Sequence, residues 1–288
     1  MKAGLAAAGL GLLALVGGLS GQDQGSPEVR GQVDWLKGIY TLDLSGAIPR
    51  EEAVAPISGG RTEDLLKDAA VQRLPGELMK LPLSSAETLG DRAQKDPSLY
   101  SDLSAAGEQL AFDFTKTDRS YLKLSVRYHL DLAPALASRF SPSEADEVDP
   151  VLSWSPTRDF SGLVIYARGD LPLGGTTAQA AVTPVLLPRI LDSDQETILD
   201  SGRVDPQFLK KWGIAAYSTS LFEDSQRDRI GYDPLRVVAH AVYGRIPGDL
   251  VLSRADSLRV RASAGLRRAL SEGRVLIILS PPEGKTHE

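Results

Sequence analysis

Residues 122–132 read LKLSVRYHLDL, and apolar and polar side chains alternate along the whole stretch. Leucine, valine and tyrosine occupy the even positions, whereas lysine, serine, arginine, histidine and aspartate occupy the odd ones. Because successive side chains of a strand point to opposite faces of a sheet, this pattern predicts an antiparallel strand with one buried and one wet face. We therefore expect the first half of the chain to be built on a half-buried sheet.

The segments on either side of this strand predict the rest of a first α+β module. Apolar and polar residues alternate on both sides of Gly38, which predicts one strand over residues 32–44 with a bend at the glycine. Apolar residues at helical spacing predict two helices, over residues 61–74, where Pro75 ends the helix, and over residues 97–110.

The second half of the chain is richer in short apolar runs. Runs of this kind predict buried strands over residues 162–167 (GLVIYA), 181–187 (AVTPVLL), 213–219, 235–243, 249–252 and 274–279 (RVLIIL). The tripeptide Arg168-Gly169-Asp170 is predicted to be a turn after the first of these strands. Strands and helices alternate irregularly, which favours an α+β fold of two mixed α/β modules with largely antiparallel sheets over a doubly wound parallel sheet.

One long helix is predicted near the end of the second half. Ser253 and Asp256 form a capping-box pattern, and Gly273 stands where a helix often ends, so we expect a helix over residues 254–271. Arg254, Arg261 and Arg268 recur every seven residues and would lie along one flank of it. This flank is a candidate surface for an acidic partner, a lipid headgroup or a cell-wall polymer, and the alternative is a solvated basic face.

Composition predicts the boundaries of these modules and a signal for export. The apolar run at 3–19 follows Met1-Lys2 and precedes small residues, which predicts a signal peptide over residues 1–20; an uncleaved anchor is the alternative. We expect no membrane span after cleavage. The remaining divisions are a linker at 21–31, a first module at 32–140, an acidic Pro/Ser linker at 141–158, a second module at 159–280 and a polar tail at 281–288.

The residue counts exclude several classes of chemistry. The 288 residues include no cysteine, which excludes disulfides, thiol nucleophiles, iron–sulfur clusters, thiolate zinc sites and a lipidated N-terminal cysteine. With 32 basic and 38 acidic residues the net charge is -6, which argues against nucleic acid as the partner.

Few residues are candidates for catalysis. His129 lies between Arg127 and Asp131 on the wet face of the alternating strand, a pattern that favours a ladder of charged side chains over a catalytic group. His240 lies in an apolar strand, which favours a core or sheet-face residue. The acidic residues of the linker at 141–158 lack the spacing of a calcium loop. We therefore predict no catalytic residue, no cofactor and no metal site.

Three stretches of the second module carry a family resemblance: SGLVIYARGDLP with TPVLLPRILDSD, then RIGYDPLRVVAHAVYG, then DLVLSRADSLRVRASAGLRRALSEGRVLIIL. They resemble exported bacterial envelope proteins related to small outer-membrane lipoproteins and flagellar outer-membrane assembly proteins. The resemblance implies a non-enzymatic protein that builds or attaches to envelope structures, and it brings no catalytic residues. The chain departs from the lipoprotein pattern because its leader has no cysteine.

The resulting prediction is an exported, non-enzymatic envelope protein with a structural or assembly role at the flagellar apparatus or outer membrane. It would lie in the periplasm or on the periplasmic face of the outer membrane. Its partners would be envelope or flagellar proteins or copies of itself, and not nucleic acid. One alternative is a periplasmic ligand- or glycan-binding module with a cleft between the modules and Trp154 as an aromatic contact. A further alternative is a hydrolase that uses carboxylates and His240.

Overall fold

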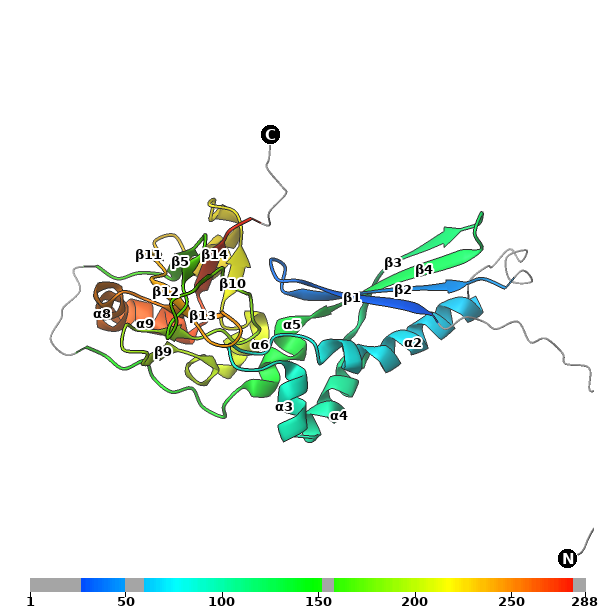
Figure 1. Cartoon of the computed structure of the whole chain (residues 1–288), viewed down its shortest axis with the longest axis horizontal. Helices are drawn as coiled ribbons and strands as arrows, with labels where there is room; N and C mark the ends of the chain where they lie inside the picture. The colour runs from blue at the N-terminus through cyan, green and yellow to red at the C-terminus, as the bar shows by residue number, and fades with distance from the viewer. Residues whose placement is uncertain (1–26, 50–59, 152–157, 282–288) are drawn as a thin grey trace, which may run out of the picture.

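The structure is a computed structural model, and it describes residues 27–49, 60–151 and 158–281. The predicted leader, Trp154 and residues 282–288 lie outside the described residues. Figure 1 shows two α+β modules side by side, which confirms the predicted fold class. Among the described helices, none is long and apolar enough to cross a membrane.

The first module contains one antiparallel sheet with the strand order β1-β2-β4-β3. Its strands are β1 (Glu28–Asp34), β2 (Ile39–Ala47), β4 (Lys123–Asp131) and β3 (Ala111–Asp118). β4 confirms the alternation that predicted it, because its even-numbered side chains are buried and its odd-numbered ones are not. The edge strand β3 is almost wholly exposed, and its sequence AFDFTKTD did not predict it.

The predicted strand at 32–44 is instead a hairpin. All of β1 pairs with β2, from Glu28 opposite Ser45 to Asp34 opposite Ile39, and residues 35–38 reverse the chain between them. The Asp34 carboxylate accepts hydrogen bonds from the amides of Leu36 and Lys37, at 3.1 and 3.2 Å, and Gly38 has a φ of +68°. A local side-chain acceptor and a glycine at positive φ are what a tight turn requires, so the bend becomes a full reversal.

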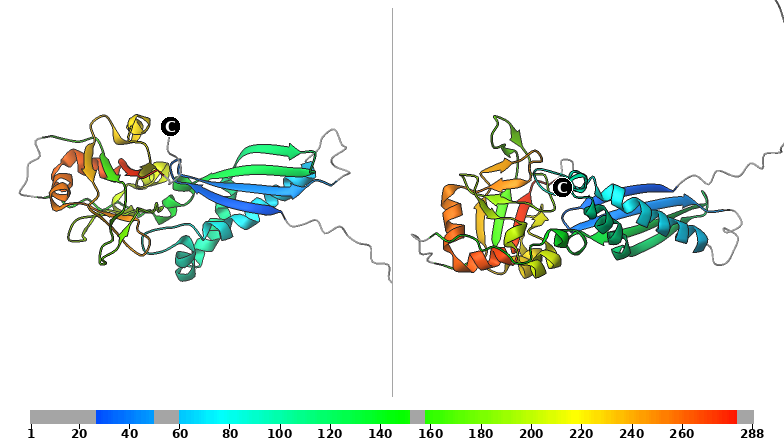
Figure 2. Two further views of the ribbon diagram at one scale, coloured as in Figure 1. Left: turned by 45° about the horizontal axis from the view of Figure 1, so that its top comes forward. Right: turned by 90° about the horizontal axis from the view of Figure 1, so that it is seen from below.

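One face of this sheet is covered by α2 (Gly60–Leu78), as both views in Figure 2 show. Leu66, Ala70 and Leu74 are buried between the helix and the sheet. The prediction that Pro75 ends this helix is wrong, because α2 continues for three more residues and Met79 N donates to Pro75 O at 3.1 Å. Pro75 and Leu78 are both buried, and this burial offsets the amide hydrogen bond that the proline cannot make.

Shorter elements complete the first module. The predicted helix at 97–110 is present as α4 (Ser98–Ala105) followed by a 3-10 turn, η1 (Ala106–Gln109). The chain also forms α3 (Leu89–Lys95), which had not been predicted, and then α5 (Leu132–Ala135) and η2 (Ala137–Phe140) lead out of β4. Residues 141–151 have no regular secondary structure, and Asp146 N donates to Gly202 O of the second module at 2.8 Å.

The second module is organised around a parallel sheet with the strand order β10-β14-β5-β11. Its strands are β5 (Leu163–Ala167), β10 (Ala216–Ser218), β11 (Leu235–Val238) and β14 (Val275–Leu279). β5 and β14 confirm two predicted strands, and their continuous apolar runs follow from burial on both faces, which parallel strands require. Antiparallel pairs are still the majority among the described strand pairs of the two modules together.

A second, mixed sheet has the order β12-β13-β8-β9. It consists of β12 (Ala241–Tyr243), β13 (Asp249–Val251), β8 (Ile190–Leu191) and β9 (Thr197–Leu199), and a small ribbon pairs β6 (Leu171–Pro172) with β7 (Gln179–Ala180). The single strand predicted at 235–243 is therefore wrong. The chain leaves the parallel sheet after β11 and enters the mixed sheet with β12, so residues 239 and 240 connect two sheets.

Residues 181–187, also predicted as a strand, form an irregular segment. Pro184 and the following Pro188 have no amide hydrogen for a ladder, and the amides of Leu186 and Leu187 donate to Pro82 O and Leu83 O of the first module, at 3.0 and 2.8 Å. The segment is thus bound across the module boundary.

The helix predicted over 254–271 is broken into α8 (Arg254–Ala262) and α9 (Ala264–Ser271). Ser253 caps α8 as predicted, with its hydroxyl accepting from Asp256 N at 3.1 Å. Ser263 caps α9 in the same way, and its hydroxyl also donates to Asp159 Oδ1 at 3.0 Å. Side-chain hydrogen bonds of this kind compete with the helix, which explains the break. The remaining elements are η3 (Ser201–Arg203), α6 (Pro206–Trp212), η4 (Asp224–Gln226) and α7 (Arg227–Ile230).

The two modules share one hydrophobic core and a buried polar contact at their boundary. The Asp249 carboxylate of β13 is fully buried, and it accepts from the Ser85 hydroxyl at 2.6 Å and from Arg189 Nε at 2.9 Å. An exposed ion pair, Arg245 with Asp91 at 2.6 Å, lies at the same boundary. These contacts hold the modules together, so a site between them has fixed walls.

Candidate binding site between the modules

A cleft of about 1020 Å³ lies between the two modules. On the side of the second module it is lined by Ala167 and Leu279, the last residues of the parallel strands β5 and β14, and by Thr219, which follows β10. On the other side it is lined by the hairpin β1–β2 and by the wet face of the first sheet. The carboxyl ends of parallel strands are a common position for ligands in α/β sheets, so this cleft is the candidate site.

The hairpin tip is fixed by an aromatic contact. The ring of Trp35 meets that of Tyr217 edge-on, with centroids 6.1 Å apart and an interplanar angle of 74°. The Tyr217 hydroxyl donates to Val185 O at 3.0 Å and accepts from Val185 N at 3.1 Å, and burial raises the pKa of this phenol. Because both hydrogen bonds fix the Tyr217 hydroxyl, its ring holds Trp35 at the edge of the cleft.

The wet face of β4 supplies a charged wall. Arg127 donates to both oxygens of Asp43 on β2, at 2.6 and 3.0 Å, and this carboxylate raises the pKa of Arg127. The guanidinium carbon also lies 5.0 Å from the centre of the Phe114 ring. His129 pairs through Nδ1 with Asp113 of β3, and not with its sequence neighbours. The ladder predicted from the sequence is present, and it crosses three strands.

The opposite wall contains the predicted turn. Gly169 has a φ of +76°, and its amide donates to the hydroxyl of Ser280 at 2.7 Å, so the chain after β5 is tied to the chain after β14. The neighbouring Asp170 is exposed, and among the described residues its carboxylate has no hydrogen-bond or ion-pair partner. It is therefore open to solvent and to a ligand.

The chemistry of the cleft is suited to binding. Within the described lining, no hydroxyl side chain is hydrogen-bonded to a histidine or to a carboxylate, so no serine or threonine there has an activating base. No group of three or more potential metal ligands lies together in the described parts of the chain. What the lining does offer is a tryptophan, aliphatic side chains and several charged groups around a preformed hollow.

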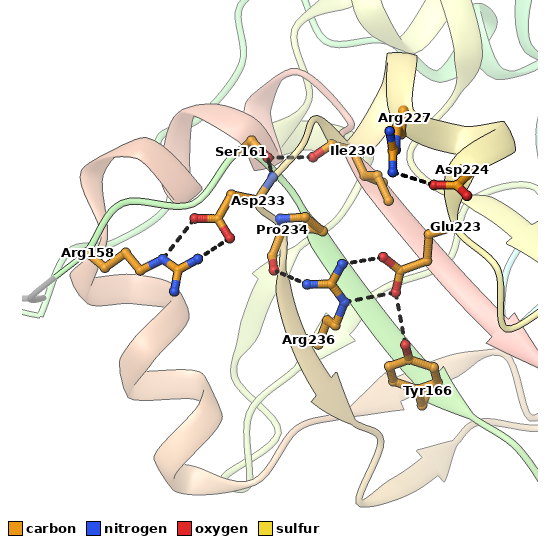
Figure 3. A network of polar contacts seen from close by, with 10 residues as sticks. All are labelled: Arg158, Ser161, Tyr166, Glu223, Asp224, Arg227, Ile230, Asp233, Pro234 and Arg236. Carbon is orange, nitrogen blue, oxygen red and sulfur yellow. Dashed lines mark hydrogen bonds and ion pairs between the residues drawn. The ribbon is translucent and has the colours of Figure 1, made fainter.

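A second polar cluster lies on the face of the parallel sheet that is turned away from the shared core, and Figure 3 shows it from close by. Glu223 accepts from the Arg236 guanidinium at 2.6 and 3.0 Å and from the Tyr166 hydroxyl at 2.9 Å. Arg158 pairs with Asp233, which lowers the pKa of that carboxyl. Each charged side chain drawn there has a partner, so the cluster fastens the loop before α7 to strands β5 and β11.

The predicted arginine flank is divided by the helix break. Arg254 and Arg261 on α8 line a small pocket of about 180 Å³, whereas Arg268 lies on α9 and is exposed. Arg261 is held by Asp192 at 2.9 Å and by Glu196 at 3.5 Å, and its Nε has no hydrogen-bond partner among the described residues. The structure therefore does not bring the three arginines onto one helix face, and their role in partner binding stays a prediction.

His240 lies outside the cleft. Its side chain is exposed between β11 and β12, in contrast to the core or sheet-face position predicted for it. Its backbone amide donates to Val251 O at 2.8 Å, and no described side chain is within hydrogen-bond distance of its ring. The change of sheet at this point exposes a residue whose sequence neighbours are apolar.

Sequence reasoning missed most residues of the cleft because they come from separate segments. Trp35 and Asp170 are 135 positions apart in the chain, and only the docking of the modules brings their segments to one hollow. The one available signal was the pair of turns, at Asp34 to Gly38 and at Arg168 to Asp170, which mark loops at the ends of strands.

Comparison with protein families matches each module separately. Residues 26–139 match the family model of the N-terminal domain of Treponema pallidum Tp0624, and residues 162–281 match that of the second domain of the same protein. The match to the N-terminal domain precedes the match to the second domain along the chain, so the chain is similar to these two domains of Tp0624 in the same order. No curated protein matches the chain.

Proposed function

We propose that this chain is an exported, non-enzymatic protein of the bacterial cell envelope that binds a ligand or partner in the cleft between its two modules. The observation that carries the proposal is the hollow of about 1020 Å³ at the carboxyl ends of β5 and β14, which the first module closes from the other side. The apolar leader at 3–19 supports export.

The walls of the cleft are suited to a preformed binding site. Trp35 is held by Tyr217, and the modules are joined by the buried Asp249 contact, so the walls keep their separation without a ligand. A preformed site spends little free energy on ordering itself when a ligand binds.

A structural role in an envelope assembly is the second candidate. The sequence resemblance predicts a place at the outer membrane or flagellar apparatus, and the two matched domain models add no function to that prediction. Exposed apolar side chains on β11 and the loops before it support a protein partner: Leu221, Phe222, Tyr232 and Val238 are 53, 82, 88 and 65% exposed. A protein partner would cover such groups and remove them from water.

Photo-crosslinking from single cysteines tests the cleft directly. Because the chain has no cysteine, one introduced thiol carries the only label. A maleimide benzophenone at Thr219→Cys would report on the cleft, at Val238→Cys on the apolar surface, and at Ser104→Cys on an exposed control position of α4.

We expect the probe at Thr219→Cys, after incubation with an envelope extract of the producing cell, to yield adducts that are absent from the Ser104→Cys sample. A glycan, peptide or small-molecule adduct would identify a ligand. Adducts that form only from Val238→Cys would favour the assembly role, and identical adducts from all three positions would contradict the cleft as a binding site. Fractionation of the same cells would test export, since recovery in the cytoplasm contradicts it.

A further inference from the structure

The cleft carries an excess of negative charge. Its lining contains four carboxylates against two basic side chains: Asp34, Asp43, Asp113 and Asp170 against Lys37 and Arg127. Two of these carboxylates have their cation within the lining, since Asp43 pairs with Arg127 and Asp34 lies 3.6 Å from Lys37. Asp113 pairs with His129 and also lies in the field of Arg127, whereas Asp170 has no partner among the described residues.

This imbalance selects among ligand classes. A phosphate, a nucleotide or an acidic glycan would bring its negative charge against Asp113 and Asp170, and like charges brought together across an interface cost free energy. A ligand with ammonium or guanidinium groups would instead pair with the exposed carboxylate of Asp170. Trp35 adds an aromatic ring at the same cleft, and such rings attract cations as well as apolar groups.

The remaining lining suits a polypeptide. Ala181, Val182, Pro184 and Leu279 contribute apolar surface. The backbone amide and carbonyl of Val182, a partly exposed residue, have no hydrogen-bond partner among the described residues, so both are open to a ligand. A polypeptide offers both an amide and a carbonyl to pair with them. The volume is at the upper end of the range for small-molecule sites, which leaves room for more than a single metabolite.

From these observations we infer that the cleft takes a basic polypeptide segment, in which lysine or arginine side chains stand next to apolar ones. The inference rests on the proposed function, because it requires the cleft to be the binding site. Asp170 receives the positive charge, Trp35 and the aliphatic residues receive the apolar side chains, and Val182 bonds the ligand backbone.

The test uses the whole chain and three probes of defined chemistry. They are an acetylated and amidated tetrapeptide of alternating lysine and valine, the same peptide with glutamate in place of lysine, and the uncharged sugar chitotetraose. Isothermal titration at low and high salt would be carried out with the wild type, with Asp170→Asn and with Asp194→Asn. Asp194 is an exposed acid beside the arginines of α8, outside the cleft, and serves as the matched control.

We expect the lysine peptide alone to bind, with an affinity that falls as salt screens the charges. Asp170→Asn should weaken it about five-fold, the upper range for an exposed ion pair, and Asp194→Asn should leave it unchanged. Equal losses in both variants would overturn the inference, because they would show general attraction to an acidic chain. Binding of the glutamate peptide or of chitotetraose instead would also overturn it while leaving the cleft as the binding site. If no probe binds and the Thr219→Cys crosslinker forms no specific adduct, the proposed function fails as well.

Discussion

Arg189 and Asp249, both of the second module, form the ion pair that presents a buried carboxylate to Ser85 of the first module, and this pair provides the sharpest test of the polar contact at the boundary. Asp249 is fully buried and accepts four hydrogen bonds, from the Ser85 hydroxyl and from the amide, Nε and Nη2 of Arg189. The substitution Arg189→Met removes the cation and leaves the carboxylate in the boundary with only the hydroxyl and one amide as donors. Water cannot replace the lost donors unless the boundary opens.

The magnitude follows from the burial of the remaining charge. Removing one partner of a buried ion pair costs about 3–5 kcal/mol. Because the Arg189 side chain is itself 39% exposed, its attraction to Asp249 is partly screened, and we expect the lower end, about 3 kcal/mol. The double variant Arg189→Met/Asp249→Leu removes the buried charge as well, and it should be more stable than Arg189→Met alone.

Urea unfolding followed by tryptophan fluorescence would measure these changes as shifts of the midpoint at constant slope. Arg245→Met is the matched control, because its pair with Asp91 lies at the same boundary but is 64 and 40% exposed, and it should cost at most about 1 kcal/mol. The reasoning is refuted if Arg189→Met costs no more than Arg245→Met, or if the double variant is less stable than Arg189→Met.

Three further outcomes follow from single residues. Gly38→Ala should destabilise the protein by about 1–2 kcal/mol because φ is +68° at the hairpin turn. Gly76→Ala, at an exposed position of α2, should stabilise it by about 0.5–1 kcal/mol. The urea midpoint should therefore shift down in the first variant and up in the second. The pKa of Asp91 is lowered from its ordinary value of 3.8 by hydrogen bonds from the α3 N-cap amide and from Arg245, so its contribution to stability is present above that value and is lost as pH falls through the lower folded pKa. Midpoints measured from pH 5 to pH 2 should therefore fall less steeply in Asp91→Asn than in the wild type, and parallel curves would contradict this. Arg229 is buried and donates to three backbone carbonyls, and burial lowers its pKa to about 9, so the guanidinium is still charged at neutral pH. Arg229→Met should cost about 3 kcal/mol in a thermal or urea melt. A loss below about 1 kcal/mol would argue against a stabilising role for these three hydrogen bonds.

Local periodicity predicted the elements whose surroundings are simple. The strand β4 has one wet and one buried face, so its alternation could be read directly, and the buried strands β5 and β14 could be read from their apolar runs. The helix cap at Ser253 and the turn after β5 could also be predicted, because each depends only on residues within three or four positions.

The wrong predictions share a physical cause, which is competition from contacts distant in sequence. Ser263 breaks a helix because Asp159, 104 positions earlier, accepts its hydroxyl. Residues 181–187 fail to form a strand because Pro184 and the following Pro188 lack amide hydrogens for a ladder. The amides of Leu186 and Leu187 instead donate to carbonyls across the module boundary. Apolar runs alone also did not show that the sheet of the second module is parallel, since periodicity carries no information on strand direction.

By itself, the sequence determined an α+β chain of two modules, with no cysteine chemistry and an apolar run at residues 3–19, because composition and periodicity are properties of the chain alone. Only the tertiary structure decided where a ligand would bind. The modules dock on a shared core and around a buried carboxylate, and this brings together the carboxyl ends of β5 and β14, the hairpin with Trp35, and Asp170. Docking depends on which surfaces fit and which polar groups find partners, and no window of sequence contains both sides of that fit.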